Sequence, residues 1–134
     1  MFDHVTIRVA DFKASKRFYS TVLGPLGIVL TYEDAAFAEW ADFSIAADGG
    51  PVTHDLHAAF AAVDNAAVDA FWEAGLAAGY TGNGAPSERP QYHAGYYAAY
   101  LLDPDGNNIE AVCHNRASLA GAGSRPAEPG SAGA

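Results

Sequence analysis

The chain contains an internal repeat, and a repeat of this length limits the possible folds more than any single motif does. The segment HVTIRVADFKASKRFYSTVL, which starts at His4, aligns without a gap with HAAFAAVDNAAVDAFWEAGL, which starts at His57, at an offset of 53 residues. The matched positions keep the residue or its class: they are His4 and His57, Asp11 and Asp64, Ala14 and Ala67, Phe18 and Phe71, Tyr19 and Trp72, and Leu23 and Leu76. The two halves are therefore predicted to be copies of one structural unit.

Each copy is predicted to begin with a strand that is followed by a helix. The stretch HVTIRVA alternates apolar and polar residues, which is typical of a strand with one buried face. Asp11 follows it in the first copy and Asp64 in the second, and aspartate caps helices by accepting backbone N–H bonds. Amphipathic residues at helical spacing come next. These helices are expected to end near the sequence GPLG in the first copy and at Gly79 in the second.

Three short segments that are predicted to be strands follow each helix. They are IVLTYE, AFAEWA and FSIAA in the first half, and GYTGNG, GYYAAYLL and NNIEAVCH in the second. The predicted fold class is therefore α+β, with two βαβββ modules in a pseudo-twofold arrangement. We place one domain at residues 1–115, with its modules at about 2–50 and about 55–115, and a disordered tail rich in Ala, Gly, Ser and Pro at residues 116–134.

Composition excludes several classes of partner. The 134 residues suffice for one domain, and the net charge of −9 argues against binding of nucleic acid, which needs clustered basic residues. The single cysteine, Cys113, cannot form an internal disulfide, so a reducing cytoplasm is the expected location. The N-terminus lacks the pattern of a secretory signal, and no apolar run is long enough to suggest a membrane span.

Glu110 is an acid inside an apolar segment. The turn sequence DPDGNN before it predicts a hairpin, and a hairpin centred on Asp105 places Tyr100 directly opposite Glu110. A one-residue slip would reverse the face. Three interpretations stay open: Glu110 points to solvent, pairs with a buried arginine such as Arg8, or binds a metal ion that supplies the missing positive charge.

The repeat strengthens the third interpretation. His4 and His57 occupy equivalent places near the start of the first strand of each unit, so their imidazoles can converge if the units pack as pseudo-twofold mates. Two imidazoles and one carboxylate are a common ligand set for Fe, Ni, Mn or Zn. His93 lies in a Gly- and Pro-flanked loop and is a candidate for proton transfer, because histidine titrates near neutral pH. Arg89 is a candidate anchor for an anionic substrate.

The chain resembles the vicinal oxygen chelate superfamily, which includes glyoxalase I, extradiol dioxygenases and bleomycin-resistance proteins. The resemblance covers roughly residues 2–115 and depends on HVTIRVADFKASKRFYSTVLGPLG, HAAFAAVDNAAVDAFWEAG and, above all, GYYAAYLLDPDGNNIEAV. It implies paired βαβββ modules that form a curled sheet around a cleft, with His4, His57 and Glu110 at metal-ligand positions. Glyoxalase I adds a carboxylate at the end of the first module, where this chain has Ile45 and Ala46.

The resemblance also implies a function. It suggests an enzyme that uses one divalent metal ion on a small oxygen-chelating substrate, as a lyase, an isomerase or a ring-cleaving dioxygenase. Glu110, Tyr100 and His93 would be its catalytic residues, and a homodimer its usual assembly. The alternative is a metal-free protein that binds a small molecule or drug, like the bleomycin-resistance branch, for which an acidic, tyrosine-rich chain would suit a cationic ligand.

Overall fold

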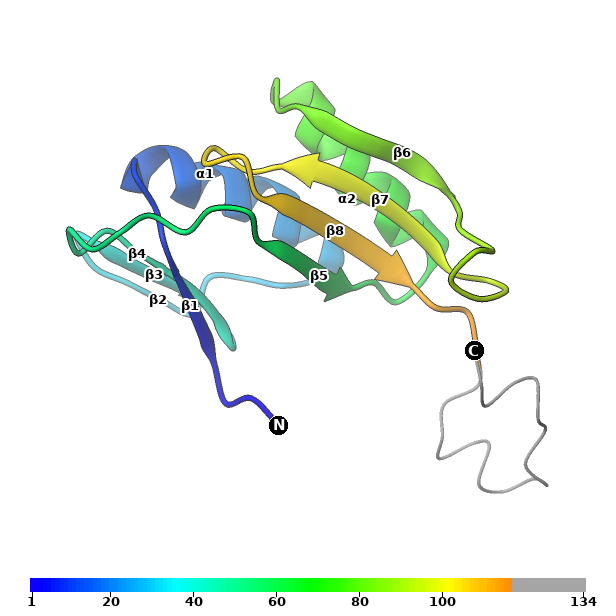
Figure 1. Ribbon diagram of the computed structural model, residues 1–134, viewed down its shortest axis with the longest axis horizontal. Helices are drawn as coiled ribbons and strands as arrows, with labels where there is room; N and C mark the ends of the chain where they lie inside the picture. Colours follow the sequence, from blue (N-terminus) through cyan, green and yellow to red (C-terminus); the bar gives the residue numbers. More distant parts are fainter. Residues whose placement is uncertain (117–134) are drawn as a thin grey trace.

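The structure is a computed structural model that describes residues 1–116 (Figure 1). Each half of the chain forms the predicted sequence of one strand, one helix and three strands. The first half contains β1 (Val5–Arg8), α1 (Phe12–Leu23), the 3-10 turn η1 (Gly24–Leu26), β2 (Tyr32–Glu33), β3 (Phe37–Trp40) and β4 (Phe43–Ala46). The second half contains β5 (His57–Ala61), α2 (Asn65–Ala77), β6 (Gly82–Glu88), β7 (Tyr97–Leu102) and β8 (Asn108–Cys113). The predicted tail at 116–134 lies, apart from Arg116, outside the described residues.

The strands form two four-stranded sheets with the same topology. The strand order is β1-β4-β3-β2 in the first sheet and β5-β8-β7-β6 in the second. In each sheet the first strand pairs in parallel with the last, and the other neighbours are antiparallel. This arrangement confirms the α+β fold class with two βαβββ modules, whose sheets are curled and not closed. Within residues 1–116, no helix is long and apolar enough to cross a membrane.

Both helices begin where the sequence predicts. The Asp11 carboxylate accepts a hydrogen bond from the Ala14 amide at 3.1 Å, and Asp64 accepts one from Ala67 at 2.8 Å. Each bond satisfies an amide that the first turn of a helix otherwise leaves without a partner. The second helix ends at Ala77, and Gly79 then adopts a φ of 90°, which is readily available to glycine alone.

The predicted strands after each helix differ from the structure mainly at the sheet edges. Of IVLTYE only Tyr32–Glu33 forms a strand, and β6 begins at Gly82 and continues to Glu88, well past the predicted GYTGNG segment. Pro86 lies within β6, which is tolerated because β6 is an edge strand and its free side needs no amide donor. The pairing of β6 with β7 also shifts register twice, between Gly82 and Gly84 and between Gly84 and Ser87.

The hairpin between β7 and β8 has the predicted register, with Tyr100 paired with Glu110. A buried polar network fixes its turn. One oxygen of Asp103 accepts hydrogen bonds from the amides of Asp105 and Asn107, and the other accepts one from the hydroxyl of Tyr19 on α1 at 2.6 Å. The turn that sets the register of β8 is thus attached to the helix of the other module.

The two modules share one hydrophobic core. Helices α1 and α2 contact each other, and α2 packs on β6, β7 and β8 (Figure 1). Across the module boundary, Phe43 of β4 meets Phe60 of β5 edge to face, with ring centroids 5.1 Å apart. Burial of an aromatic side chain of this size contributes about 2–3 kcal/mol. The shared core therefore fixes how the two sheets lie relative to each other, and the opposite face of the second sheet lies on the side away from the helices.

Candidate functional site

The candidate site lies on the face of the second sheet that points away from the helices, which we call the open face. Side chains alternate along a strand, so Ala58, Phe60 and Ile109 pack into the core while their neighbours point the other way. The open face carries His57 and Ala59 from β5, Ala98 and Tyr100 from β7, Glu110 and Val112 from β8, and Tyr96 from the residue before β7.

Glu110 is the buried centre of this face. Its side chain is 1% exposed, whereas the neighbouring His57 side chain is 56% exposed. The His57 Nε2 atom lies 2.6 Å from Glu110 Oε1, and the Tyr96 hydroxyl donates a hydrogen bond to Glu110 Oε2. Among residues 1–116 no lysine or arginine forms an ion pair with Glu110.

Two of the three interpretations of Glu110 are therefore wrong. Glu110 does not point to solvent, because Tyr96, Tyr100 and His57 surround it. It does not pair with Arg8, since the Arg8 Nε atom lies 2.9 Å from Asp48 Oδ1 on the first module. What is left is a buried carboxylate in contact with an imidazole and tyrosine hydroxyls, and a buried carboxylate is costly without a counter-charge.

Two tyrosine hydroxyls near Glu110 keep their protons. Burial, followed by the charge of Glu110, raises the pKa of Tyr100 to about 12. Burial and the hydrogen bond to Glu110 raise the pKa of Tyr96 well above its ordinary value. Sequence reasoning chose Tyr100 and missed Tyr96 as the hydroxyl that bonds Glu110. The signal was present, because Tyr96, Ala98 and Tyr100 alternate and so share one face.

The structure does not bring His4 to this pair. The ring of His4 precedes β1, is 64% exposed, and places its Nδ1 atom 2.8 Å from Asp3 Oδ1. In the described part of the chain, no three or more His, Cys, Asp and Glu side chains lie together as a metal site would require. Two of the three predicted ligands, His57 and Glu110, are adjacent. An imidazole nitrogen and a carboxylate oxygen are suitable donors to a divalent ion.

The first module carries no acid at the position equivalent to Glu110. Ala59 pairs with Glu110 in the second sheet, and the repeat-equivalent Thr6 pairs with Ser44 in the first. The acid was expected at Ile45 or Ala46, but strand pairing shows that the equivalent position is one or two residues earlier, at Ser44. The Oγ atom of Ser44 lies 2.7 Å from Thr6 Oγ1, and Ser44 is 2% exposed. A small neutral hydrogen-bonded pair replaces the second carboxylate.

His93 contacts the ring of Tyr96, whose hydroxyl is bonded to Glu110. Its Nδ1 atom donates to the Ala94 carbonyl at 2.9 Å, and its Nε2 atom lies 2.8 Å from Nδ1 of His114. Both imidazoles contact Tyr96, with centroid distances of 5.3 Å for His93 and 5.2 Å for His114. Burial, with Arg116 and His93 as further causes, lowers the pKa of His114. The predicted proton-transfer residue is therefore near the site but does not touch Glu110.

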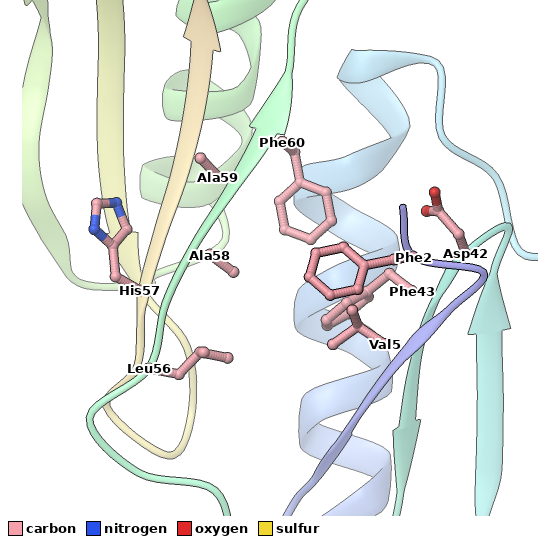
Figure 2. Close-up of a pocket in the computed structure, with 9 residues that line it drawn as sticks. All are labelled: Phe2, Val5, Asp42, Phe43, Leu56, His57, Ala58, Ala59 and Phe60. Atoms are coloured by element: carbon pink, nitrogen blue, oxygen red, sulfur yellow. The ribbon is translucent and has the colours of Figure 1, made fainter.

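A cavity of about 430 Å³ lies at the junction of the two sheets (Figure 2). Figure 2 shows Phe2, Phe43 and Phe60 directed toward one another there, whereas the His57 imidazole points away from them. The cavity is lined by Phe2, Val5, Asp42, Phe43, Leu56, His57, Ala58, Ala59 and Phe60. Its lining is mainly apolar, and it shares His57 and Ala59 with the open face.

The fold and site together define a class: paired βαβββ modules with a histidine and a buried glutamate on one open sheet face. Residues 1–111 match the family model described as the Glyoxalase/Bleomycin resistance protein/Dioxygenase superfamily. The chain therefore belongs to this superfamily. A comparison with curated proteins gave no match.

Solved structures of similar fold agree with this assignment. A glyoxalase/bleomycin resistance protein from Albidiferax ferrireducens is 35% identical, with a TM-score of 0.70, over 83% of this chain and 97% of that one. An enzyme of the glyoxalase/bleomycin resistance protein/dioxygenase family from Burkholderia phytofirmans is 24% identical, with a TM-score of 0.64, over 82% and 95%. The lactoylglutathione lyase from Agrobacterium tumefaciens is 18% identical, with a TM-score of 0.60, over 84% and 92%. The last two likenesses show the fold alone.

Proposed function

We propose that the protein is a divalent-metal-dependent enzyme that acts on a small substrate through two neighbouring substrate oxygens, as a lyase, an isomerase or a dioxygenase. The observation that carries the proposal is the buried Glu110 carboxylate, which pairs with the His57 imidazole and with no lysine or arginine in the described residues. Superfamily membership supports it. We further propose a cytoplasmic homodimer.

His57 and Glu110 would hold the metal ion, and His4 is the predicted third ligand. The ion, which would be Fe, Ni, Mn or Zn, would supply Lewis-acid stabilisation of negative charge on the substrate oxygens. His4 is mostly exposed and contacts its sequence neighbour Asp3, so no packed contact in the core holds its imidazole in place.

The protein's own hydroxyls and imidazoles would orient the substrate and move its protons. Tyrosine keeps its hydroxyl proton at neutral pH, and burial and Glu110 raise the pKa values of Tyr96 and Tyr100 further above that range. The Tyr96 hydroxyl already donates its proton to Glu110 Oε2, so Tyr100 is the hydroxyl that would donate a hydrogen bond to a substrate oxygen on the open face. His93, in contact with the ring of Tyr96, is the proposed group that accepts or releases a proton at working pH.

Metal analysis of the wild type and four variants tests the ligands. Protein purified without chelator is analysed by mass spectrometry and titrated with Fe(II), Ni(II), Mn(II) and Zn(II). We expect one bound ion in the wild type, loss of the ion in His57→Ala and Glu110→Gln, and weaker binding in His4→Ala. The exposed His54 provides the matched control, and His54→Ala should bind as the wild type does. Full occupancy in His57→Ala would contradict the ligand assignment.

A metal-free binding protein is the second candidate function. The position of His4 outside the pair favours it, because only two predicted ligands are adjacent. The net charge of −9 and the tyrosines of the open face would then suit a cationic or aromatic ligand. If the wild type holds no metal and none of the four ions raises its melting temperature, this function becomes the better supported one.

A further inference from the structure

Arg89, which directly follows β6, lies over the open face with part of its guanidinium unused. Its guanidinium carbon lies 5.1 Å from the centroid of the Tyr100 ring. Its Nη2 atom donates to the Ala85 carbonyl at 2.8 Å. The Nε atom is buried and has no hydrogen-bond partner among residues 1–116. Because a buried Nε atom is out of reach of a molecule from solvent, an external anion would meet the Nη1 side of the guanidinium, for which no hydrogen bond is found within residues 1–116.

The sheet beneath this guanidinium makes room for it. Gly84 of β6 pairs with Tyr100 of β7. A Cβ atom at position 84 would lie 2.8 Å from Tyr100 Cδ1 and 3.3 Å from Arg89 Nη2. A side chain larger than glycine would therefore displace the ring or the guanidinium. The absence of a side chain at Gly84 leaves room for the Arg89 guanidinium over the Tyr100 ring.

No acid among residues 1–116 forms an ion pair with Arg89. Within the described residues, Arg8 pairs with Asp48 and Lys16 pairs with Glu33, but no carboxylate lies within 4.0 Å of the Arg89 guanidinium. The chain carries 16 acidic residues against 7 basic ones, so pairing partners are abundant. A guanidinium that stays unpaired in such a chain is available to an anion from outside the protein.

The strand β7, which carries Tyr100, lies between β6, which Arg89 follows, and β8, which carries Glu110. The His57 and Tyr100 ring centroids are 6.1 Å apart, and Arg89 contacts the same Tyr100 ring. A small flat molecule that lies along Tyr100 would thus meet a positive charge at one end and the His57–Glu110 pair at the other. Guanidinium binds carboxylates more specifically than ammonium does, because its fork matches both oxygens.

We propose that Arg89 is a specificity-determining residue that binds the carboxylate of a small, planar organic acid on the open face. The inference rests on the proposed function, since it names the substrate class of the same site. It requires neither the metal ion nor His4 for the anion to bind. Anion binding and metal binding can therefore be measured separately.

The test is calorimetric titration of chelator-treated protein with benzoate and with benzamide, which has the same ring and no charge. The wild type should bind benzoate at least about tenfold more tightly than benzamide, as a charge-assisted hydrogen bond predicts. Arg89→Met should lose that preference. Arg89→Lys, which keeps the charge without the fork, should retain part of it. The exposed Arg17 provides the control, and Arg17→Met should behave as the wild type does.

Metal occupancy of Arg89→Met, measured in parallel, separates this inference from the proposed function. Equal binding of benzoate and benzamide by the wild type, or undiminished benzoate binding by Arg89→Met, would overturn the role of Arg89 even if metal binds. Benzoate binding that depends on Arg89 in a protein that holds no metal would support the inference and remove the metal-dependent function. A circular dichroism spectrum confirms that each variant is folded, and Arg89→Lys decides the case if Arg89→Met is not.

Discussion

Removal of the Tyr19 hydroxyl is predicted to destabilise the hairpin that positions Glu110. The hydroxyl donates to Asp103 Oδ2 at 2.6 Å, and the two residues are 0% and 4% exposed. Phenylalanine fills nearly the same volume, so Tyr19→Phe deletes the bond without a cavity. A hydrogen bond to a charged group contributes about 1.5–3 kcal/mol, and no water can replace a buried one. Because Asn107 Nδ2 remains 3.2 Å from the same oxygen, we expect a loss of about 2 kcal/mol.

Tyr97→Phe is the matched control for this prediction. The Tyr97 hydroxyl donates to Asp69 Oδ1 at 2.7 Å, but both residues are partly exposed, so water can take its place. Its loss should cost less than about 1 kcal/mol. Urea unfolding followed by circular dichroism measures both variants, and Tyr19→Phe should also lower Tm by roughly 8 °C. Equal losses in the two variants, or a loss below about 0.5 kcal/mol for Tyr19→Phe, would refute the reasoning.

Three further predictions concern Glu110, the tyrosines and the thiol. In chelator-treated protein, Glu110→Gln should be as stable as the wild type or more stable in urea, because it removes a buried charge; a loss above about 2 kcal/mol would contradict this. Burial, then Asp103, raises the pKa of Tyr19, and burial, then Glu110, raises that of Tyr100 to about 12. The stability that these shifts provide is complete below pH ~10, the unfolded pKa, and is lost as the pH rises through the folded values. The urea midpoint should therefore fall above pH ~10, and a constant midpoint there would be inconsistent with the shifts. Cys113 is 6% exposed and should react with a thiol reagent only after unfolding; rapid labelling of the native protein would show an accessible sulfur.

Local signals predicted most of the fold. The Asp11 and Asp64 caps depend on bonds within one turn, and the DPDGNN turn fixes its own backbone, so their effects can be read from adjacent residues. The turn also sets the register of the hairpin, and side chains alternate between the two faces of a strand. The sequence therefore predicted that Tyr100 lies opposite Glu110 on the same face, as the structure shows. The limits of β6 were not predictable in this way, since an edge strand with register shifts depends on its partner strand.

Contacts between distant segments account for what the sequence missed at the site. His4 and His57 are equivalent in the repeat, yet only His57 lies beside Glu110. Equivalence in sequence predicts equivalent places within each module, but it does not determine how closely two modules bring those places together. The serine that replaces a second acid was likewise identified only by strand pairing, which aligns Ser44 with Thr6.

The sequence by itself determined the repeated βαβββ pattern, the helix starts and the hairpin register, because each depends on residues close together in the chain. Only the tertiary structure decided that Glu110 is buried under His57 and Tyr96, and that the Arg89 guanidinium lies over Tyr100 above Gly84. The physical reason is that the burial of a side chain, and whether its charge is paired, depend on all the residues that surround it. That environment is assembled from several strands and loops, and no single segment of the sequence contains it.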